Sequence, residues 1–155
     1  MPAPEIKTIL CAVDFSEHSA TVADYANVLA QNMNARVVAL YVAPTLSQYV
    51  GFNVPPDSIE NFVGEITSGA QKTMQAFLDE RLPGIKAKGE VSTGEPAEEI
   101  LRIAKLEKAD IIIMATHGRT GIDRLLFGSV AEKVVKNAPV PVLTVRRHEE
   151  AENKS

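Results

Sequence analysis

The sequence has a single cysteine, no segment of concentrated basic charge and no long apolar run. Cys11 has no second cysteine for an intramolecular disulfide and fits a reducing compartment, so we expect a cytoplasmic protein. The 16 basic and 20 acidic residues are spread along the chain, give a formal net charge of -4 and offer no basic stripe to nucleic acid. No apolar run approaches the roughly 18 residues of a membrane span. We therefore expect neither nucleic acid nor a membrane as a partner.

Strand-like and helix-like segments alternate along one expected domain, residues 1–155, which ends in a polar tail at 147–155. Short apolar runs predict strands at 6–13, 36–42, 85–91, 110–115 and 140–145. Apolar residues at helical spacing predict a helix in each interval. Connections of this kind are crossovers between parallel strands. They predict a doubly wound α/β fold, an open sheet of five parallel strands with helices on both faces.

Single residues add finer expectations about these elements. Ser16 is expected to cap the first helix by accepting a hydrogen bond from a free N–H group. The run 110–115 is the most hydrophobic and should be central in the sheet. Gly89 weakens the strand at 85–91, and Pro141 removes a hydrogen-bond donor from the last strand, so both strands are expected at sheet edges.

The loop after the fourth predicted strand is rich in glycine. It contains Gly118, Gly121 and Gly128. Ligands of doubly wound sheets bind beyond the carboxyl ends of the strands, and free N–H groups at a helix start favour phosphate. From 117 to 136, four basic minus two acidic residues leave a charge of +2. Spacing alone permits two interpretations, a phosphate loop or ordinary turns with Ser129 as the N-cap of the next helix.

Three familiar patterns do not occur in the sequence. No Lys stands beside Gly128, which excludes a Walker-type phosphate loop. The first strand ends in Ala-Val-Asp without the G-x-G-x-x-G dinucleotide fingerprint. A response-regulator receiver needs an acidic pair after the first strand, an aspartate after the third and a lysine after the last. Here Asp14 stands alone, Val91 is followed by Ser-Thr-Gly and Val145 by Arg-Arg.

Nearly the whole chain, from ILCAVDFSEHS to VPVLTVRR, resembles the universal stress protein family. ATP-binding members of that family carry G-x2-G-x9-G-[ST] after the fourth strand. Here nine residues separate Gly118 from Gly128 and Ser129, and Ala115 stands in place of the first glycine. The resemblance implies a Rossmann-like sheet of strand order 3-2-1-4-5 and an ATP-binding function. Alanine at this position crowds the backbone only if a positive φ or a contact closer than a methyl group is needed.

The resemblance also implies a role for each matching position. Asp14 would lie near the ribose or a metal-bound phosphate, with helix capping as the alternative. Val42 would offer its main chain to the adenine edge, and Met114 would line the adenosine pocket. Backbone N–H groups of the glycine loop would bind the triphosphate, with charge added by Arg119. The nucleotide-binding candidates are Ala12, Val13, Asp14, Val42, Met114, Ala115, His117, Gly118, Arg119, Gly128, Ser129 and Val130.

No catalytic residue and no metal site made by the protein are predicted. A triphosphate near so few cations needs a divalent ion, and we expect Mg2+ held mainly by the phosphates and water. His117 is interpreted as a residue that orders the turn, because no second His or Cys stands at ligand spacing.

Three functions remain open at this point. The first is a nucleotide-dependent stress-response or signalling module, and the second is a slow ATPase or phosphotransfer protein, which needs a group that orients water at the γ-phosphate. The third is a family member that binds no ATP and acts through contacts with an unidentified partner protein, which Ala115 keeps open. The strand at 140–145 also predicts a homodimer, because pairing with its own copy protects an apolar sheet edge.

Overall fold

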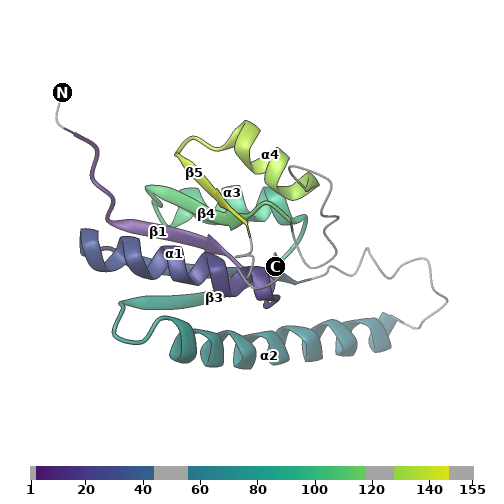
Figure 1. Cartoon of the computed structure of the whole chain (residues 1–155). Helices are drawn as coiled ribbons and strands as arrows, with labels where there is room; N and C mark the ends of the chain where they lie inside the picture. Colours follow the sequence, from purple (N-terminus) through teal and green to yellow (C-terminus); the bar gives the residue numbers. More distant parts are fainter. Residues whose placement is uncertain (1–2, 44–55, 118–127, 147–155) are drawn as a thin grey trace, which may run out of the picture.

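The computed structural model describes residues 3–43, 56–117 and 128–146, so most of the loop after the second strand, the glycine loop from 118 to 127 and the tail from 147 lie outside the described residues. Strands and helices alternate along the described chain (Figure 1). They are β1 Thr8–Ala12, α1 Glu17–Met33, β2 Arg36–Ala43, α2 Pro56–Arg81, β3 Ala87–Thr93, α3 Pro96–Leu106, β4 Ile111–Ala115, α4 Ser129–Asn137 and β5 Val142–Val145.

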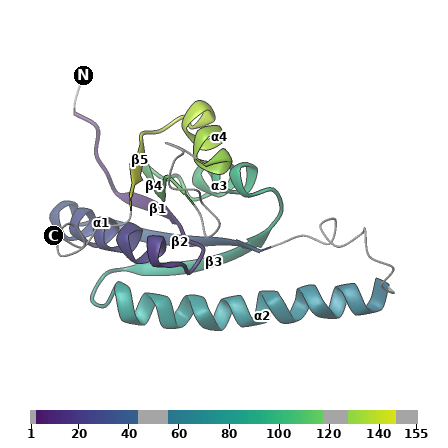
Figure 2. The same ribbon diagram turned by 45° about the vertical axis from the view of Figure 1, so that its right-hand side comes forward.

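The five strands form one parallel sheet in the order β3-β2-β1-β4-β5. The predicted fold class and strand order are therefore confirmed. Helices α1 and α2 cover one face of the sheet, and α3 and α4 cover the other (Figure 1, Figure 2). β3 and β5 are the edge strands, as expected. β4 is an interior strand, but the central strand is β1. β2 and β3 lie on one side of β1, and β4 and β5 lie on the other.

Both faces of the sheet are buried, which explains why its inner strands are continuous apolar runs. On β1, Ile9 and Cys11 belong to the core beneath α1 and α2, and Leu10 belongs to the core beneath α3 and α4. Val22 of α1 and Val134 of α4 complete these two cores and are both 0% exposed. Burial raises the pKa of Cys11 to about 12, so this thiol is an apolar core group at neutral pH.

The structure differs from the sequence-based prediction at β3 and at Ser16. β3 begins and ends two residues later than the predicted segment 85–91, because the Ile85 N–H donates back to the Leu82 carbonyl at 3.3 Å in the turn after α2. Ser16 occupies the N-cap position of α1, but its side chain makes no capping hydrogen bond. The Ser16 hydroxyl donates to the Asp14 carboxylate instead, which accepts more strongly than a neutral group.

Gly89 of β3 and Pro141, just before β5, have different structural roles. A Cβ atom at Gly89 would overlap Cγ of Met74 on α2, so the glycine lets this helix lie directly on β3. Pro141 precedes β5, and its carbonyl accepts a hydrogen bond from the Ile112 N–H at 3.0 Å. β5 begins at the next residue, later than the predicted start of the segment 140–145.

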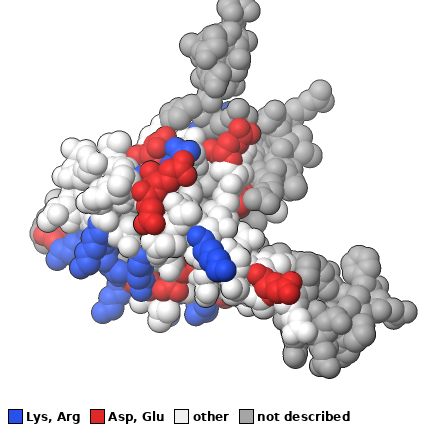
Figure 3. Space-filling model, turned by 90° about the horizontal axis from the view of Figure 1, so that it is seen from below, with Lys and Arg blue, Asp and Glu red and all other residues white. Residues whose placement is uncertain are grey.

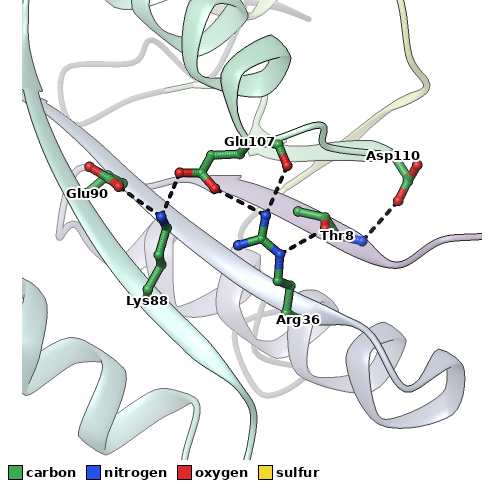
Figure 4. A network of polar contacts seen from close by, with 6 residues as sticks. All are labelled: Thr8, Arg36, Lys88, Glu90, Glu107 and Asp110. Atoms are coloured by element: carbon green, nitrogen blue, oxygen red, sulfur yellow. Dashed lines mark hydrogen bonds and ion pairs between the residues drawn. The ribbon is translucent and has the colours of Figure 1, made fainter.

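Charged side chains pair at the amino edge of the sheet, where Glu107 follows α3 (Figure 4). Its carboxylate lies 2.7 Å from Lys88 Nζ and 3.1 Å from a terminal nitrogen of Arg36, and its side chain is 12% exposed. Arg36 also donates to Thr8 Oγ1 at 3.0 Å. Asp110 accepts the Thr8 N–H at 3.0 Å. These contacts join the starts of β1, β2 and β3 to the end of α3 and the start of β4.

The described helices include none long and apolar enough to cross a membrane. Figure 3 shows the molecule from below, the side on which α2 lies, with acidic and basic side chains sharing the described surface. Neither sign of charge covers that face continuously.

Candidate functional site

The candidate site lies at the carboxyl edge of the sheet, where the central strand ends before its neighbours. β1 pairs with β2 as far as Ala12 and Leu40, and the Val13 N–H still donates to the Leu40 carbonyl at 2.9 Å. Alternate residues of a parallel strand direct their N–H and C=O groups to the same side. Val42, two residues after Leu40, therefore directs both main-chain groups into the space beyond the end of β1.

β4 presents main-chain groups to the same space from the other side of β1. The Thr116 N–H donates to the Val145 carbonyl of β5 at 2.9 Å, so the preceding residue, Ala115, faces β1. The register of β1 with β4 ends at Ile113, which leaves Ala115 beyond the paired region. Ala115 lies in regular strand and is not among the described non-glycine residues with positive φ, so alanine fits here without left-handed backbone strain.

The turn after β1 is organised around Asp14. One carboxylate oxygen of Asp14 accepts hydrogen bonds from the Ser16 N–H at 3.0 Å, the Ser16 hydroxyl and the Ser19 hydroxyl. The Asp14 N–H in turn donates to the Ser19 hydroxyl at 2.9 Å. Ser19 is 2% exposed, so the network is anchored in the core. Asp14 therefore orders the entry into α1 while its side chain borders the site.

Helix α4 begins at the same edge. The Gly128 N–H donates to the Thr116 carbonyl at 2.7 Å, and a Cβ at Gly128 would lie 3.3 Å from that oxygen. The φ angle of Gly128 is -74°, so glycine serves close approach here and not a left-handed conformation. The N–H groups of Ser129 and Val130 follow in the first turn of α4, where a helix supplies no acceptor and carries partial positive charge.

Helix α3 also begins at this edge and is linked to α4 by charge. The Glu95 carboxylate caps α3 by accepting the Glu98 N–H at 2.7 Å, and this hydrogen bond is the main cause that lowers the pKa of Glu95. Lys133 of α4 lies 3.4 Å from the Glu95 carboxylate and 3.6 Å from that of Glu98. The ion pairs hold the starts of the two helices together.

A cavity of about 420 Å³ occupies the space between these strand ends and helix starts. All the predicted site residues that the structure describes line it. They are Ala12, Val13, Asp14, Val42, Met114, Ala115, His117, Gly128, Ser129 and Val130. Gly118 and Arg119 lie outside the described residues.

Sequence reasoning missed several other lining residues. They are Ser19, Val22, Leu40, Tyr41, Pro96, Ile100, Thr116 and Ala131. Most of them are apolar and have the periodicity of core residues, so no local sequence pattern distinguishes residues that line the cavity from residues of the core. Ser19 was detectable in principle, because a hydroxyl one turn into a helix can bond an acid just before that helix.

His117 is the one histidine among the described lining residues. Its Nδ1 atom lies 3.2 Å from Thr116 Oγ1, which fits the interpretation that His117 orders the turn. Within the described part of the chain, its Nε2 atom is buried without a hydrogen-bond partner. A buried polar atom left in this way costs about 1–3 kcal/mol, so Nε2 is a candidate contact for a bound molecule.

The donor set of the described cavity does not form a metal cage. No group of three or more His, Cys, Asp or Glu placed to hold a metal occurs in the described residues. Asp14 supplies the one carboxylate among the described lining residues. A magnesium ion prefers about six oxygen ligands, so this site fits Mg2+ only when phosphates and water provide most of them.

Comparisons with known proteins agree with this geometry. The model of the universal stress protein family matches residues 5–146. The universal stress protein MJ0531 of Methanocaldococcus jannaschii is 37% identical over 145 residues, which is 91% of this chain and 82% of that protein. A universal stress protein of Thermus aquaticus is 35% identical over 141 residues, or 90% of this chain and 98% of that one.

The solved structure of MJ0577, a universal stress protein of Methanocaldococcus jannaschii, superposes with a TM-score of 0.82 at 30% sequence identity and covers 95% of this chain and 100% of that one. Since a family model spans nearly the whole sequence and relatives above 30% identity cover most of it, the chain belongs to the universal stress protein family.

Proposed function

We propose that this chain is a cytoplasmic, single-domain universal stress protein that binds ATP with Mg2+ at the carboxyl edge of its sheet and signals through the bound state. The observation that carries the proposal is the convergence of strand ends and helix starts on one cavity of about 420 Å³. That volume is in the range of small-molecule sites. The cavity also lies beside β1, where the strand order reverses, which is the usual ligand position in doubly wound sheets.

The inner part of the cavity suits an adenine base. Met114 and Ile100 supply apolar surface for its faces, and the main chains of Val42 and Ala115 supply donors and acceptors for its edge. A universal stress protein solved in complex with cAMP and one from Archaeoglobus fulgidus solved in complex with dAMP have the same fold, at TM-scores of 0.60 and 0.57 and identities of 20% and 21%. In those proteins, this architecture accompanies an adenine nucleotide.

The outer part of the cavity suits the phosphates. The first turn of α4 directs the N–H groups of Ser129 and Val130 toward an anion, and the family motif implies further phosphate contacts from Gly118 and Arg119. Bound Mg2+ would neutralise phosphate charge. Asp14, which lines the cavity, would contact the ion through water.

The proposal is one of binding without rapid turnover. Hydrolysis needs a group that orients water at the γ-phosphate. Asp14 carries the one carboxylate and His117 the one imidazole among the described lining residues, and each already has a structural contact, with Ser19 and Thr116 respectively.

Isothermal titration calorimetry of nucleotide-free protein tests the proposal. Ser129 is exposed at the first position of α4, where a glutamate is favourable for the helix, so Ser129→Glu should fold while its charge repels phosphate. We expect it to weaken Mg-ATP binding at least about tenfold and to leave adenosine binding unchanged. Val135→Glu adds the same charge at an exposed position of α4 that does not line the described cavity, and it should bind Mg-ATP like the parent.

The other outcomes point to the other functions. A parent protein that binds neither Mg-ATP nor adenosine would contradict the proposal and favour action through protein contacts alone. Multiple-turnover release of phosphate that is lost in Ser129→Glu would favour an ATPase.

We also propose a homodimer formed through β5, the edge strand within the predicted segment 140–145. The Thr116 N–H donates to the Val145 carbonyl, so the main-chain groups of the adjacent residue, Thr144, face away from β4. We expect light scattering at micromolar concentration to give twice the 16.8 kDa of one chain. Thr144→Pro, which removes an outward N–H, should give a monomer. A parent protein of monomer mass would contradict this proposal.

A further inference from the structure

Three aromatic rings pack together beside the cavity. The ring centroid of Phe15 lies 4.9 Å from that of Tyr41 in a tilted arrangement and 5.9 Å from that of Phe77 in an edge-to-face arrangement. Phe15 belongs to the turn after β1, Tyr41 to β2 and Phe77 to α2. All three are partly buried against the core beneath α1 and α2. We call them the aromatic trio.

Two members of the trio are next in sequence to residues that we propose contact the ligand. Phe15 directly follows Asp14, and Tyr41 directly precedes Val42. Tyr41 lines the cavity, whereas Phe77 is not among its described lining residues. A change at Phe77 can therefore reach the site through the other two rings and the backbone that carries them.

The backbone of Phe15 depends on this packing. Its φ angle is 63°, in the left-handed region that a bulky residue rarely occupies. The conformation is held on one side by the ring contacts with Tyr41 and Phe77 and on the other by the hydrogen bonds between Asp14 and Ser19. Loss of the ring contacts should let the turn relax and move the Asp14 carboxylate.

We propose that Phe77 is a positioning residue that couples helix α2 to the nucleotide site through the aromatic trio. The inference rests on the proposed function, which supplies the nucleotide as ligand. It goes beyond that function by naming α2 as the helix whose packing changes when the nucleotide binds. Coupling between two sites is reciprocal. A nucleotide that orders Asp14 and Val42 therefore tightens the packing of α2, and a partner that shifts α2 alters nucleotide affinity.

A matched pair of variants tests the coupling. Phe77→Ala removes the α2 member of the trio. Met74→Ala, on the same helix, removes a side chain that is 3% exposed, packs over Gly89 of β3 and is not one of the three rings. We expect both variants to unfold at lower urea concentration than the parent. Only Phe77→Ala should weaken Mg-ATP binding, at least about fivefold, and Phe77→Leu should restore part of the affinity.

A second readout needs no nucleotide. In nucleotide-free protein, Phe77→Ala should shift the amide NMR signals of Asp14, Ser16 and Ser19, and Met74→Ala should leave them in place. The inference would be overturned by equal losses of Mg-ATP affinity in the two variants, or by amide signals of Asp14, Ser16 and Ser19 that do not shift in Phe77→Ala. If the parent binds no nucleotide, the proposed function fails, and the amide signals still decide whether α2 is coupled to the turn. If Phe77→Ala does not fold, Phe77→Leu supplies the same comparison with a smaller shift.

Discussion

At the amino edge of the sheet, charged side chains pair with one another, whereas at the carboxyl edge main-chain groups and apolar side chains face a cavity. Glu107 at the amino edge is 12% exposed and contacts both Lys88 and Arg36. The carboxyl edge has a cavity of about 420 Å³, and the buried Nε2 atom of His117 has no partner among the described residues.

We infer from this difference that the amino edge contributes to stability and that the carboxyl edge is the candidate binding site. All strands run in the same direction, so every helix that packs on the sheet begins at the carboxyl edge and ends at the amino edge. Helix starts there present N–H groups that attract anions, and helix ends at the other edge are satisfied by cations such as Arg36, which donates to the Glu107 carbonyl at 3.0 Å. Variants at the two edges should therefore change different properties.

The largest effect on stability is expected at the amino edge. Glu107→Gln leaves Arg36 and Lys88 without their shared carboxylate. A fully buried pair broken in this way would cost more, but Lys88 is 49% and Arg36 32% exposed, so we expect a loss of about 2 kcal/mol in the free energy of unfolding. Urea unfolding measures this loss.

The matched control is Glu80→Gln. Glu80 is 72% exposed and lies 3.8 Å from Arg81, so its removal should change the free energy of unfolding by less than about 0.5 kcal/mol. Mg-ATP affinity should stay within about twofold of the parent in both variants. A Glu107→Gln protein with parental stability but weakened binding would reverse the assignment of the two edges.

Acid should remove the stabilising contribution of Glu107 at the amino edge. The hydrogen bond from Lys88, and then that from Arg36, lowers the pKa of Glu107 from its ordinary 4.5. A carboxyl whose pKa is lower in the folded state stabilises fully above its unfolded pKa, and this contribution is lost as the pH falls through the folded value. The stability difference between the parent and Glu107→Gln should therefore be constant near neutral pH and shrink below about pH 4.5. A difference independent of pH would contradict a charge-based role.

The smallest effect is expected at Ala115 of the carboxyl edge. Ala115→Gly restores the family's motif glycine, but Ala115 has no left-handed backbone to relieve. We expect Mg-ATP affinity to change by less than about threefold and the free energy of unfolding to fall by about 0.5–1 kcal/mol, because glycine loses more conformational entropy in a strand. A gain of tenfold or more in affinity, measured by calorimetry, would show that the methyl group obstructs the ligand.

Much of the fold follows from sequence because the strands and helices differ in hydrophobic period. Continuous apolar runs predict buried strands, and the amphipathic segments between them predict helices. A helix between two strands connects them in parallel, and this predicts a parallel sheet. Exact boundaries do not follow, since Ile85 is apolar and packs against the core although it lies before β3. The role of Ser16 was mispredicted because its hydroxyl is directed toward the Asp14 carboxylate, to which it donates, and accepts no N–H group of α1.

The candidate site was predictable where a residue lies at a strand end or in the glycine motif. Asp14, Val42 and Gly128 are of this kind, and all line the cavity. Pro96 and Ile100 line it only because α3 packs over the sheet beside β2, a tertiary arrangement that no local pattern encodes. The aromatic trio was missed for the same reason, since Phe77 is distant in sequence from the turn that it contacts.

The most direct test of the account is a map of amide NMR shifts during titration of the nucleotide-free protein with Mg-ATP. The account predicts large, saturable shifts at the carboxyl edge, at Val42, Ala115, Ser129 and Val130. It predicts almost none at the amino edge, at Arg36 and Lys88. Shifts centred on the amino edge, or an unchanged spectrum at saturating Mg-ATP, would contradict the claim that the carboxyl edge binds the nucleotide.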